Sequence, residues 1–415
     1  MWQRRLIKRA VARLEARSLP IQVRFWDGTD YRPPMPPRLR LAIHKPEALR
    51  ALANPTLGKL ARAYVEQHLD LEGDLRDVLH IGEQLCDAAT AVDKKGSGAL
   101  SWLRHSKPGD RKNISYHYDV SNDFYGLWLD ARRVYSCAYF RHPGDSLERA
   151  QEHKLDLICR KLMLAPGERL LDIGCGWGGL ILWAAEHYRA QCVGITLSQH
   201  QYDYVWRLIE QKGLGDRVEV RLMDYRDVPD SEQYDKIASV GMFEHVGRRN
   251  LGLYFGKIYR LLKPGGLAMN HGITAAGVDS TGLRSDIAEF IEQYVFPGGE
   301  LEHVSTVVEA LSDKGLECVD AESLRPHYAR TLWHWVERLE ANADKARALV
   351  GEKKYRIWRI YMAGSANAFS RGWISLFQIL AGKPLADGSL PYPYTRDHIY
   401  QPEPAQQGMP ATRAA

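Results

Sequence analysis

The sequence of 415 residues holds six cysteines and no CxxC pair. So few cysteines, without paired spacing, argue against both a disulfide framework and a zinc site. No apolar run approaches the roughly 20 residues of a membrane-spanning helix, and the N-terminus lacks the apolar segment of a signal peptide. The sequence therefore predicts a cytoplasmic protein without a metal site, which is either soluble or attached peripherally to a membrane.

The net charge is also small, +5 at neutral pH, and by itself it does not predict nucleic acid as a partner. Positive charge is nevertheless concentrated in MWQRRLIKRAVARLEAR, residues 1–17, where apolar residues recur near helical spacing. Such a basic amphipathic helix can lie on an anionic membrane. Its apolar stripe can equally pack on its own domain, and the sequence leaves both readings open.

The apolar fraction of 45% and the aromatic fraction of 10% are those of a globular protein longer than one ordinary domain. Residues 1–92 mix strand-like and helical stretches, which predicts a small α+β module. Residues 93–112 lose this periodicity and gain glycine, serine, lysine and proline, which predicts a linker. We expect a catalytic domain over 113–388 and a flexible tail over 389–415.

Short apolar strands alternate with helical segments from about residue 167 to 320. This alternation is typical of α/β proteins in which helices cover both faces of a parallel sheet. Residues 327–381 differ, because they are rich in tryptophan and tyrosine and compatible with helix almost throughout. They predict C-terminal helices after the α/β unit.

The first strand of this unit runs into a glycine-rich turn, LLDIGCGWGGL, at residues 170–180. Such a turn presents backbone N–H groups at a helix N-terminus to a nucleotide. Dinucleotide-binding folds usually place an acid at the end of the second strand, but here that strand ends with Thr196. Asp172 in the first strand, and Asp224 with Tyr225 after the third, are instead typical of S-adenosylmethionine (SAM) methyltransferases. The turn is therefore predicted to bind SAM.

Residues 116–140, YHYDVSNDFYGLWLDARRVYSCAYF, are unusually aromatic. An aromatic core would give this composition, but a purely structural core would avoid burying the polar residues that interleave with the rings. We therefore predict a helical lid or substrate wall. The interleaved polar residues are His117, Asp119, Ser121, Asn122, Asp123 and Cys137.

Six segments in one order and spacing resemble the cyclopropane-fatty-acyl-phospholipid synthase family, which includes the mycolic acid cyclopropane synthases. They are HYDVSNDFY, YSCAYF, LLDIGCGWGG, GITLSQHQ, FEHVG and NHGI. The resemblance covers about 113–385 and continues more weakly through the N-terminal module. It implies a class I SAM-dependent methyltransferase (Rossmann-like) catalytic domain with a helical lid and C-terminal helices, after a smaller N-terminal α+β domain. It also implies transfer of a methylene group from SAM to the cis double bond of an acyl chain in a membrane phospholipid.

In the family a bound bicarbonate is the base that removes a proton from the added methyl group. The resemblance assigns its ligands to Cys137, Glu244, His271, Ile273 and Tyr328. Donors from histidine and tyrosine would fix the small anion, and the glutamate would accept its proton. A strand histidine or a tyrosine at a helix start is more often structural, so the prediction depends on the joint occurrence of these residues.

The resemblance also assigns the residues that bind SAM. They are Tyr135, Ser136, Gly174, Gly176, Thr196, Leu197, Gln201, Asp224 and Tyr225. Gln201 would supply the polar contact that the missing acid of the second strand does not. One departure is Ser365 in YMAGSANAF, where many members have cysteine. Nothing in the alkene chemistry requires a covalent enzyme intermediate, so we expect Ser365 to be compatible with activity.

The implied partner is a surface of unsaturated phospholipids at the inner face of the membrane, where segment 1–17 or the N-terminal module would hold the protein. A homodimer is implied by the resemblance as well. Two alternatives remain. An enzyme with the same cofactor can form a methyl- or methylene-branched chain or act on a different acceptor altogether, and a non-catalytic lipid-binding or regulatory protein can retain the scaffold. The glycine turn together with Glu244, His271 and Tyr328 argues against the second alternative.

Overall fold

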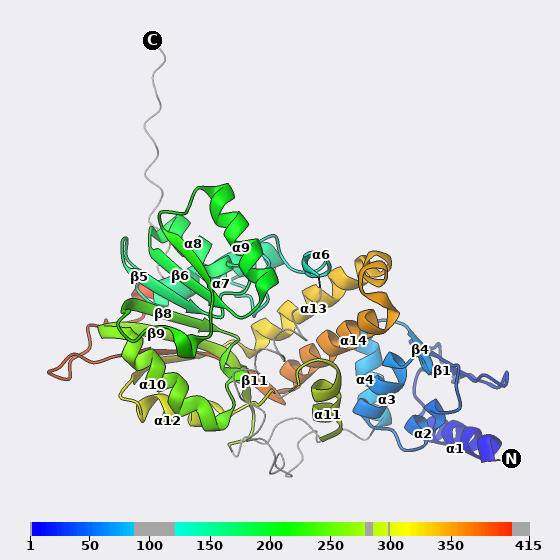
Figure 1. Cartoon of the computed structure of the whole chain (residues 1–415). Coiled ribbons are helices and arrows are strands. Elements are labelled where there is room, and N and C mark those ends of the chain that lie inside the picture. The colour runs from blue at the N-terminus through cyan, green and yellow to red at the C-terminus, as the bar shows by residue number, and fades with distance from the viewer. Residues whose placement is uncertain (1, 87–120, 279–284, 298, 401–415) are drawn as a thin grey trace.

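The computed structural model describes residues 2–86, 121–278, 285–297 and 299–400 (Figure 1). Two β-sheets organise these residues, one of four strands near the N-terminus and one of seven strands in the rest of the chain. The predicted linker, 93–112, lies outside the described residues. His117 and Asp119 of the aromatic segment lie outside them too.

The N-terminal module combines its sheet with helices. The strand order is β2-β1-β3-β4, for β1 (Ile21–Arg24), β2 (Asp30–Tyr31), β3 (Leu39–Ile43) and β4 (Leu69–Glu72). The pair β1 and β3 is parallel, whereas β2 and β4 run antiparallel to their neighbours. The helices are α1 (Trp2–Arg17), α2 (Ala48–Ala53), α3 (Leu57–Val65) and α4 (Leu75–Leu85). This part of the chain thus has the α+β composition that the sequence predicts.

The burial of α1 shows whether its apolar stripe faces a membrane or packs on its own domain. Ile7, Ala10 and Leu14 are only 5%, 3% and 2% exposed and belong to the hydrophobic core. Arg4, Arg5, Lys8 and Arg9 are exposed, whereas Arg13 and Arg17 are half-buried and donate hydrogen bonds to backbone carbonyl groups of the module. The stripe therefore packs on its own domain, and only the charged face of the helix is open to a membrane surface.

The larger sheet has the strand order β10-β11-β9-β8-β5-β6-β7. Its strands are β5 (Arg169–Ile173), β6 (Gln191–Thr196), β7 (Val218–Leu222), β8 (Tyr234–Val240), β9 (Leu262–Ala275), β10 (Glu317–Ser323) and β11 (Ile374–Gly382). Strands β5 to β9 pair in parallel, and β11 runs antiparallel to β9 and β10.

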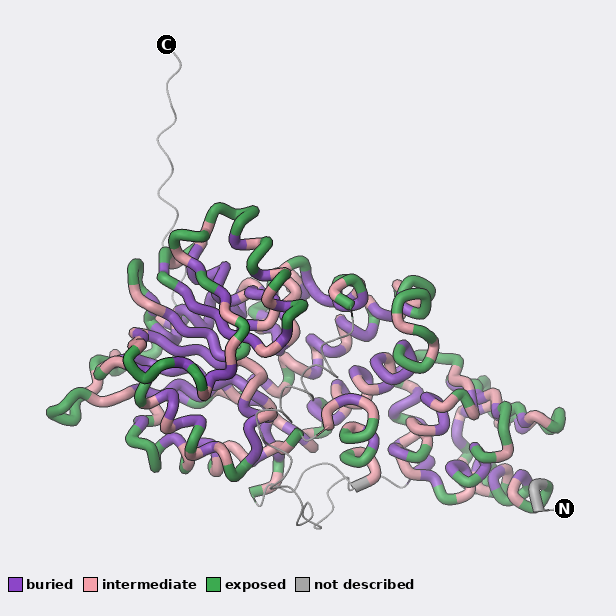
Figure 2. The backbone as a smooth tube through the Cα atoms, viewed as in Figure 1, coloured by how far each residue is buried: buried purple, intermediate pink, exposed green. Residues whose placement is uncertain are grey.

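Helices cover both faces of this sheet (Figure 1). One face carries α7 (Leu147–Lys161), α8 (Gly179–Tyr188) and α9 (Gln199–Lys212), and the other carries α10 (Leu251–Leu261) and α12 (Val304–Ser312). Figure 2 shows that the strands between these two layers are buried along most of their length. The Rossmann-like α/β arrangement predicted from the alternation of strands and helices is confirmed.

The C-terminal part differs from the sequence prediction in one element. Helices α13 (Arg325–Ala341) and α14 (Ala343–Arg371) cover most of 327–381, with a kink in α14 at Gly351. The last part instead forms β11 between β9 and β10. Because β11 is buried or half-buried along its whole length, both of its faces carry apolar residues, and periodicity does not distinguish the sequence ISLFQILAG from a buried helix.

The prediction of a flexible tail over 389–415 is wrong for its first part. Helix α15 (Asp397–Tyr400) contacts α7, and Ile399 is 1% exposed. Arg396 forms an ion pair of 2.5 Å with Asp320, a buried residue of β10. Burial of one apolar side chain and pairing of one buried carboxylate hold this segment, and neither is visible as a periodic pattern. Residues 401–415 lie outside the described residues.

Helix α14 joins the two parts of the molecule, because it contacts α3 and α4 of the module as well as α13 and β11. Its Arg356 donates to the carbonyl oxygens of Tyr64 and Leu69 at 3.0 and 3.1 Å and forms an ion pair of 2.6 Å with Asp70. These contacts fix the N-terminal module against the catalytic part. Within the described residues, no helix has the length and apolarity to cross a bilayer.

Candidate active site

Two cavities meet at the carboxyl ends of the parallel strands, where open α/β sheets bind ligands. The smaller has a volume of about 150 Å³ and lies at the ends of β5 and β6. The larger, of about 260 Å³, extends from there toward the N-terminal module. Tyr135, Ser136, Gly241 and His245 line both cavities. Ligands held in the two cavities would therefore meet at these four residues.

The glycine turn forms one wall of the smaller cavity. Gly174 and Gly176 have φ angles of 83° and 56°, in the left-handed region that glycine adopts without a steric penalty. A Cβ atom at Gly176 would meet no atom of the described chain within 4 Å. The N–H groups of Gly174 and Cys175 both donate to the Ile195 carbonyl at 3.0 Å, which ties the turn to β6. The turn thus presents bare backbone to the cavity, as close approach of a ligand requires.

The structure brings most of the predicted SAM-binding residues to this cavity. Those that line it are Tyr135, Ser136, Gly174, Gly176, Thr196, Leu197, Gln201 and Tyr225. A hydrogen bond of 2.7 Å joins Thr196 Oγ1 to Gln201 Oε1 and fixes the amide side chain. Asp224 is absent from the lining among the described residues. Its carboxylate instead accepts hydrogen bonds from Arg226, at 2.9 Å from the backbone N–H and at 2.8 and 2.6 Å from the guanidinium.

Two buried charged residues also line the smaller cavity. Asp172 is 3% exposed, and its Oδ1 has no hydrogen-bond partner within the described residues. Lys154 of α7 is 2% exposed and donates to Ser136 Oγ at 3.0 Å. Burial raises the pKa of Asp172 to about 7 and lowers that of Lys154 to about 8. A buried acceptor in need of a partner fits a cationic ligand such as SAM.

Sequence reasoning noted Asp172 but missed Lys154. A lysine in an amphipathic helix normally faces solvent, and nothing in the sequence around Lys154 marks it as buried. Only the packing of α7 on the larger sheet brings its ammonium group under Ser136.

Two buried polar residues, Glu244 and His271, lie in the wall of the larger cavity. Glu244 belongs to the 3-10 helix η3 (Phe243–His245) after β8, and His271 lies on β9; they are 8% and 1% exposed. Glu244 Oε1 accepts a hydrogen bond of 2.7 Å from the Ile273 N–H. His271 Nδ1 lies 3.2 Å from Gln378 Nε2 of β11. Within the described chain, Glu244 Oε2 and His271 Nε2 have no hydrogen-bond partner.

Burial determines the charge of both residues. It raises the pKa of Glu244 to about 7 and holds the pKa of His271 well below its usual range. The imidazole is therefore neutral near pH 7, and the carboxyl group can either hold or release a proton. If Gln378 donates to Nδ1, the ring proton of His271 is on Nε2. A neutral donor and a carboxyl group that titrates near neutrality, both in the wall of one cavity, are suited to proton transfer.

The glycine of the NHGI motif makes room for the glutamate. A Cβ atom at Gly272 would lie 2.1 Å from Phe243 Cε1 and 3.0 Å from Glu244 Oε1. Any other residue would therefore push η3 away from β9. The N–H of Ile273 is engaged by Glu244, so it holds the glutamate in place.

Cys137, Ile273 and Tyr328 line the larger cavity together with Glu244 and His271, so the structure brings the predicted bicarbonate-site residues together. Burial raises the pKa of the Cys137 thiol far above its usual value, so the side chain is a neutral thiol and a poor nucleophile. The ring of Tyr328 packs against another aromatic ring of the cavity wall, that of Phe369, with the centroids 4.7 Å apart.

The described part of the aromatic segment is mainly core and not a lid. Tyr125 and Trp128 are fully buried. The polar residues that suggested a lid have structural roles instead: Ser121 caps α6 (Asn122–Gly126) by accepting a hydrogen bond from the Phe124 N–H, and Asn122 Oδ1 accepts one of 2.8 Å from Trp177 Nε1. Polar side chains can therefore occur in an aromatic core, because a helix cap or a ring N–H gives them a hydrogen-bond partner. At the end of the segment, Tyr135, Ser136 and Cys137 do line the cavities.

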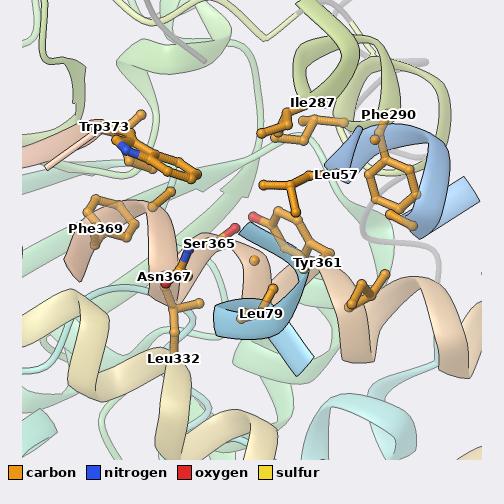
Figure 3. Close-up of a pocket in the computed structure, with 18 of the residues that line it drawn as sticks. Leu57, Leu79, Ile287, Phe290, Leu332, Tyr361, Ser365, Asn367, Phe369 and Trp373 are labelled. Atoms are coloured by element: carbon orange, nitrogen blue, oxygen red, sulfur yellow. The ribbon is translucent and has the colours of Figure 1, made fainter. Parts of the chain in front are cut away.

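Ser365 lies on α14 in the wall of the larger cavity, as Figure 3 shows. Its hydroxyl group and that of Tyr135, at the junction of the cavities, both act on the nearby Tyr361 hydroxyl group and partly offset the rise in pKa that burial causes there. Sequence reasoning missed Tyr361, whose aromatic side chain on a long helix gives no signal beyond that of a core residue. The position of Ser365 is thus connected to the junction of the cavities through the Tyr361 hydroxyl group.

Comparison with known proteins agrees with this geometry. The family model for mycolic acid cyclopropane synthetase matches residues 105–379, and that for a domain of unknown function matches residues 9–90. The chain is 47% identical over 389 residues to a Pseudomonas putida protein named "Probable fatty acid methyltransferase". The match covers 94% of this chain and 98% of that protein. It is 37% identical over 279 residues to cyclopropane mycolic acid synthase 1 of Mycobacterium tuberculosis, covering 65% of this chain and 96% of that protein.

A crystal structure of mycolic acid cyclopropane synthase CmaA1 complexed with SAH and CTAB matches with a TM-score of 0.62 and 37% sequence identity. The match covers 66% of this chain and 98% of that one. The class I SAM-dependent methyltransferase fold predicted from the sequence is thereby confirmed. By its motifs, fold and family match, the chain belongs to the mycolic acid cyclopropane synthetase family of SAM-dependent enzymes.

Proposed function

We propose that the protein transfers a methylene group from SAM to the cis double bond of an unsaturated acyl chain in a membrane phospholipid, which gives a cyclopropane ring. One observation carries the proposal. Within the described residues, Glu244 Oε2 and His271 Nε2 are buried without hydrogen-bond partners in the wall of the larger, mainly apolar cavity, which shares four residues with the predicted cofactor cavity. Such a site combines room for an acyl chain with a group that can take up a proton.

The chemistry needs both features. An isolated alkene is a weak nucleophile, so it must be held against the sulfonium methyl group in a dry and aligned geometry. Its attack forms a carbon–carbon bond, breaks the methyl–sulfur bond, and leaves a carbocation on the acyl chain beside S-adenosylhomocysteine. The rings of Tyr135 and Tyr328 in the cavity wall can stabilise this cation without being alkylated. Loss of a proton from the added methyl group then closes the ring.

SAM would be held by the residues of the smaller cavity and would supply the methyl group. The bare backbone at Gly174 and Gly176 allows its close approach. The unpartnered Asp172 oxygen, buried within the described structure, offers an acceptor to the positive charge of the ligand. Lys154 holds Ser136 at the junction of the cavities, where the methyl group must face the alkene.

We include bicarbonate in the proposal as the base. A bicarbonate ion accepts hydrogen bonds at its oxygens and donates one O–H, and this pattern complements a donor at His271 Nε2 and an acceptor at Glu244 Oε2. Cys137 and Tyr328 border the same space. Bound there, the ion would supply a base beside the added methyl group, while Glu244 accepts the proton for onward transfer.

The test is to incubate the purified protein with SAM and monounsaturated phosphatidylglycerol vesicles, and to analyse the acyl chains by mass spectrometry and proton NMR. We expect the gain of one methylene group, the loss of the alkene protons and the appearance of high-field ring protons. Depletion of dissolved carbon dioxide should slow the reaction, and added bicarbonate should restore it. If no lipid changes in a SAM-dependent way, the proposal is wrong.

A second candidate product is a methyl- or methylene-branched chain, which the name of the Pseudomonas putida relative favours. Formation of a saturated methyl branch consumes a hydride in addition to SAM, whereas ring closure or a methylene branch needs only the loss of a proton. The reaction without added reductant therefore separates the saturated branch from the other two products. Proton NMR then separates a ring from a methylene group.

We also propose that the protein acts at the inner face of the membrane. The outer face of α1 exposes Arg4, Arg5, Lys8 and Arg9, and each basic residue near an anionic surface adds about 1 kcal/mol of attraction. A homodimer remains part of the proposal, and sedimentation of the purified protein tests it.

A further inference from the structure

The larger cavity does not end in the catalytic part of the molecule. It continues between α14, α11 (Ser285–Tyr294) and the N-terminal module, where both helices and strands contribute to its wall. Representative lining residues of the module are Ile21, Leu41, Leu57, Leu60, Leu79 and Gly82. Figure 3 shows Leu57 and Leu79 in the same pocket as Tyr361 and Ser365 of α14. The module thus forms a wall of the pocket that holds the reacting groups.

The polarity of this pocket changes along its length. Every residue that the described part of the module contributes to the lining is apolar or glycine, whereas Glu244, His271 and Tyr328 lie toward the cofactor. Ile21 and Leu41 are only 1% and 5% exposed, so the wall is closed there. A phospholipid headgroup in this position would lose its water without gaining hydrogen bonds, at a large energetic cost. The methyl end of an acyl chain suits this part of the pocket.

The module is held so closely that its wall has a fixed position. The Asp286 carboxylate of α11 accepts a hydrogen bond of 2.9 Å from the Gly58 N–H of α3, and a Cβ atom at Gly58 would lie 2.2 Å from the Asp286 carbonyl oxygen. On α4, the buried carboxylate of Glu83 accepts a hydrogen bond of 2.6 Å from Asn367 Nδ2 and pairs with Arg371, both on α14. The distance from the reacting groups to this wall is therefore defined by the fold.

We propose that the N-terminal module is the wall against which the methyl end of the acyl chain rests, and that it limits the number of carbons accepted beyond the reacting double bond. This inference rests on the proposed function. It gives a role to the segment matched by a domain of unknown function, which precedes the region matched by the cyclopropane synthetase model.

Gly82 is the position at which the wall can be moved inward with least disturbance. It lies within α4, where replacement of glycine favours the helix, and a Cβ atom there would make an ordinary contact of 3.4 Å with Leu57 Cδ2. Gly82→Leu should shorten the pocket, and Leu79→Ala should lengthen it. Gly256→Leu on α10 is the matched control, because its Cβ atom would lie 3.6 Å from the flexible end of Arg260, outside the lining of both cavities.

The test uses phosphatidylglycerol vesicles with palmitoleoyl, cis-vaccenoyl or oleoyl chains and measures kcat/KM for each. Palmitoleoyl and cis-vaccenoyl chains have equal numbers of carbons beyond the double bond, and oleoyl has two more. We expect Gly82→Leu to disfavour oleoyl by about tenfold relative to the other two chains, which is the order of the transfer free energy of two methylene groups. Leu79→Ala should shift the ratio toward oleoyl, and Gly256→Leu should not change it.

Other patterns overturn the inference. If Gly82→Leu groups palmitoleoyl with oleoyl, which share the position of the double bond from the carboxyl end, the module contacts the carboxyl side of the chain. If neither pocket variant alters the ratios, the module does not limit the chain. Circular dichroism shows whether Gly82→Leu folds. If it does not, the change in the chain-length ratio of Leu79→Ala still tests the inference.

A second readout separates this inference from the proposed function. Displacement of a fluorescent fatty acid by the three free acids measures binding without SAM or turnover. Shifted binding ratios in a protein that modifies no lipid would refute the proposed function and retain the chain-length wall. Normal turnover with unchanged chain-length ratios in both assays would support the proposed function and refute the chain-length wall.

Discussion

Glu244→Gln is predicted to abolish turnover while making the protein more stable above neutral pH. The Gln Oε1 atom can still accept the hydrogen bond from the Ile273 N–H that Glu244 Oε1 accepts now, so the side chain keeps its place. Its amide nitrogen replaces the Oε2 atom, which has no hydrogen-bond partner among the described residues. The variant therefore loses the proton acceptor and retains the shape of the site.

The size of the stability effect follows from the pKa of Glu244, which burial raises from 4.5 to about 7. Below pH 4.5 the carboxyl group is protonated in both the folded and the unfolded chain. As the pH rises from 4.5 to about 7, the unfolded chain releases the proton that the folded chain retains, so wild-type stability falls. With about 1.4 kcal/mol per pH unit, the full cost above pH 7 is about 3 kcal/mol.

Glutamine does not titrate, so the variant escapes this cost. In urea unfolding, we expect it to gain about 3 kcal/mol over the wild type near pH 8 but only about 1 kcal/mol near pH 5. Binding of SAM, measured by calorimetry, should be preserved. Glu309→Gln, on the exposed side of α12, is the control and should change neither turnover nor the pH dependence.

Three results would refute this reasoning about Glu244. Retained turnover in Glu244→Gln would show that the residue is not the proton acceptor. A stability gain of equal size at both pH values would show that folding does not raise the pKa of the Glu244 carboxyl group. Loss of SAM binding would mean that the substitution disturbs the junction of the cavities.

Three further substitutions test other parts of the molecule. Asp172→Asn should weaken SAM binding by about tenfold or more, the order of one charge-assisted hydrogen bond, and an unchanged Kd would show that Asp172 does not contact the ligand. Ser365→Cys should retain kcat/KM within about tenfold, the order of one net hydrogen bond, since Ser365 lines the larger cavity but no step of the proposed chemistry uses its hydroxyl group. A much larger change would show that this hydroxyl group takes part in the reaction. Leu14→Ala should destabilise the module by about 2 to 5 kcal/mol in urea unfolding without changing co-sedimentation with anionic vesicles. A chain that lacks residues 1–17 and still binds these vesicles fully at low salt would exclude the basic face of α1 as the membrane contact.

The sequence predicted the α/β unit and its turn well because both depend on local rules. Positive φ angles at Gly174 and Gly176 require glycine at those positions, and alternating strands and helices leave alternating apolar runs. The same rules failed where burial overrides periodicity. Strand β11 carries apolar residues on both faces because it is buried or half-buried along its whole length, and Lys154 is buried by the packing of α7.

The aromatic segment and the C-terminal end show a different limit. Interleaved polar residues argue against a core only if they lack partners, but Ser121 caps the start of α6 and Asn122 accepts a hydrogen bond from the Trp177 indole N–H. The composition of residues 389–400 predicts a flexible tail, but the burial of Ile399 and the ion pair of Arg396 with Asp320 hold this segment in place. Both outcomes depend on partners far away in the sequence.

By itself the sequence determined the fold, the family and the residues at the strand ends, because their motifs fix backbone geometry over a few positions. Only the tertiary structure decided that Glu244 and His271 keep unpartnered atoms within the described chain, since this depends on burial between three strands and η3. It alone also placed the N-terminal module in the wall of the pocket. The contact between Glu83 and Asn367 joins residues 284 positions apart, and no local pattern encodes such a contact.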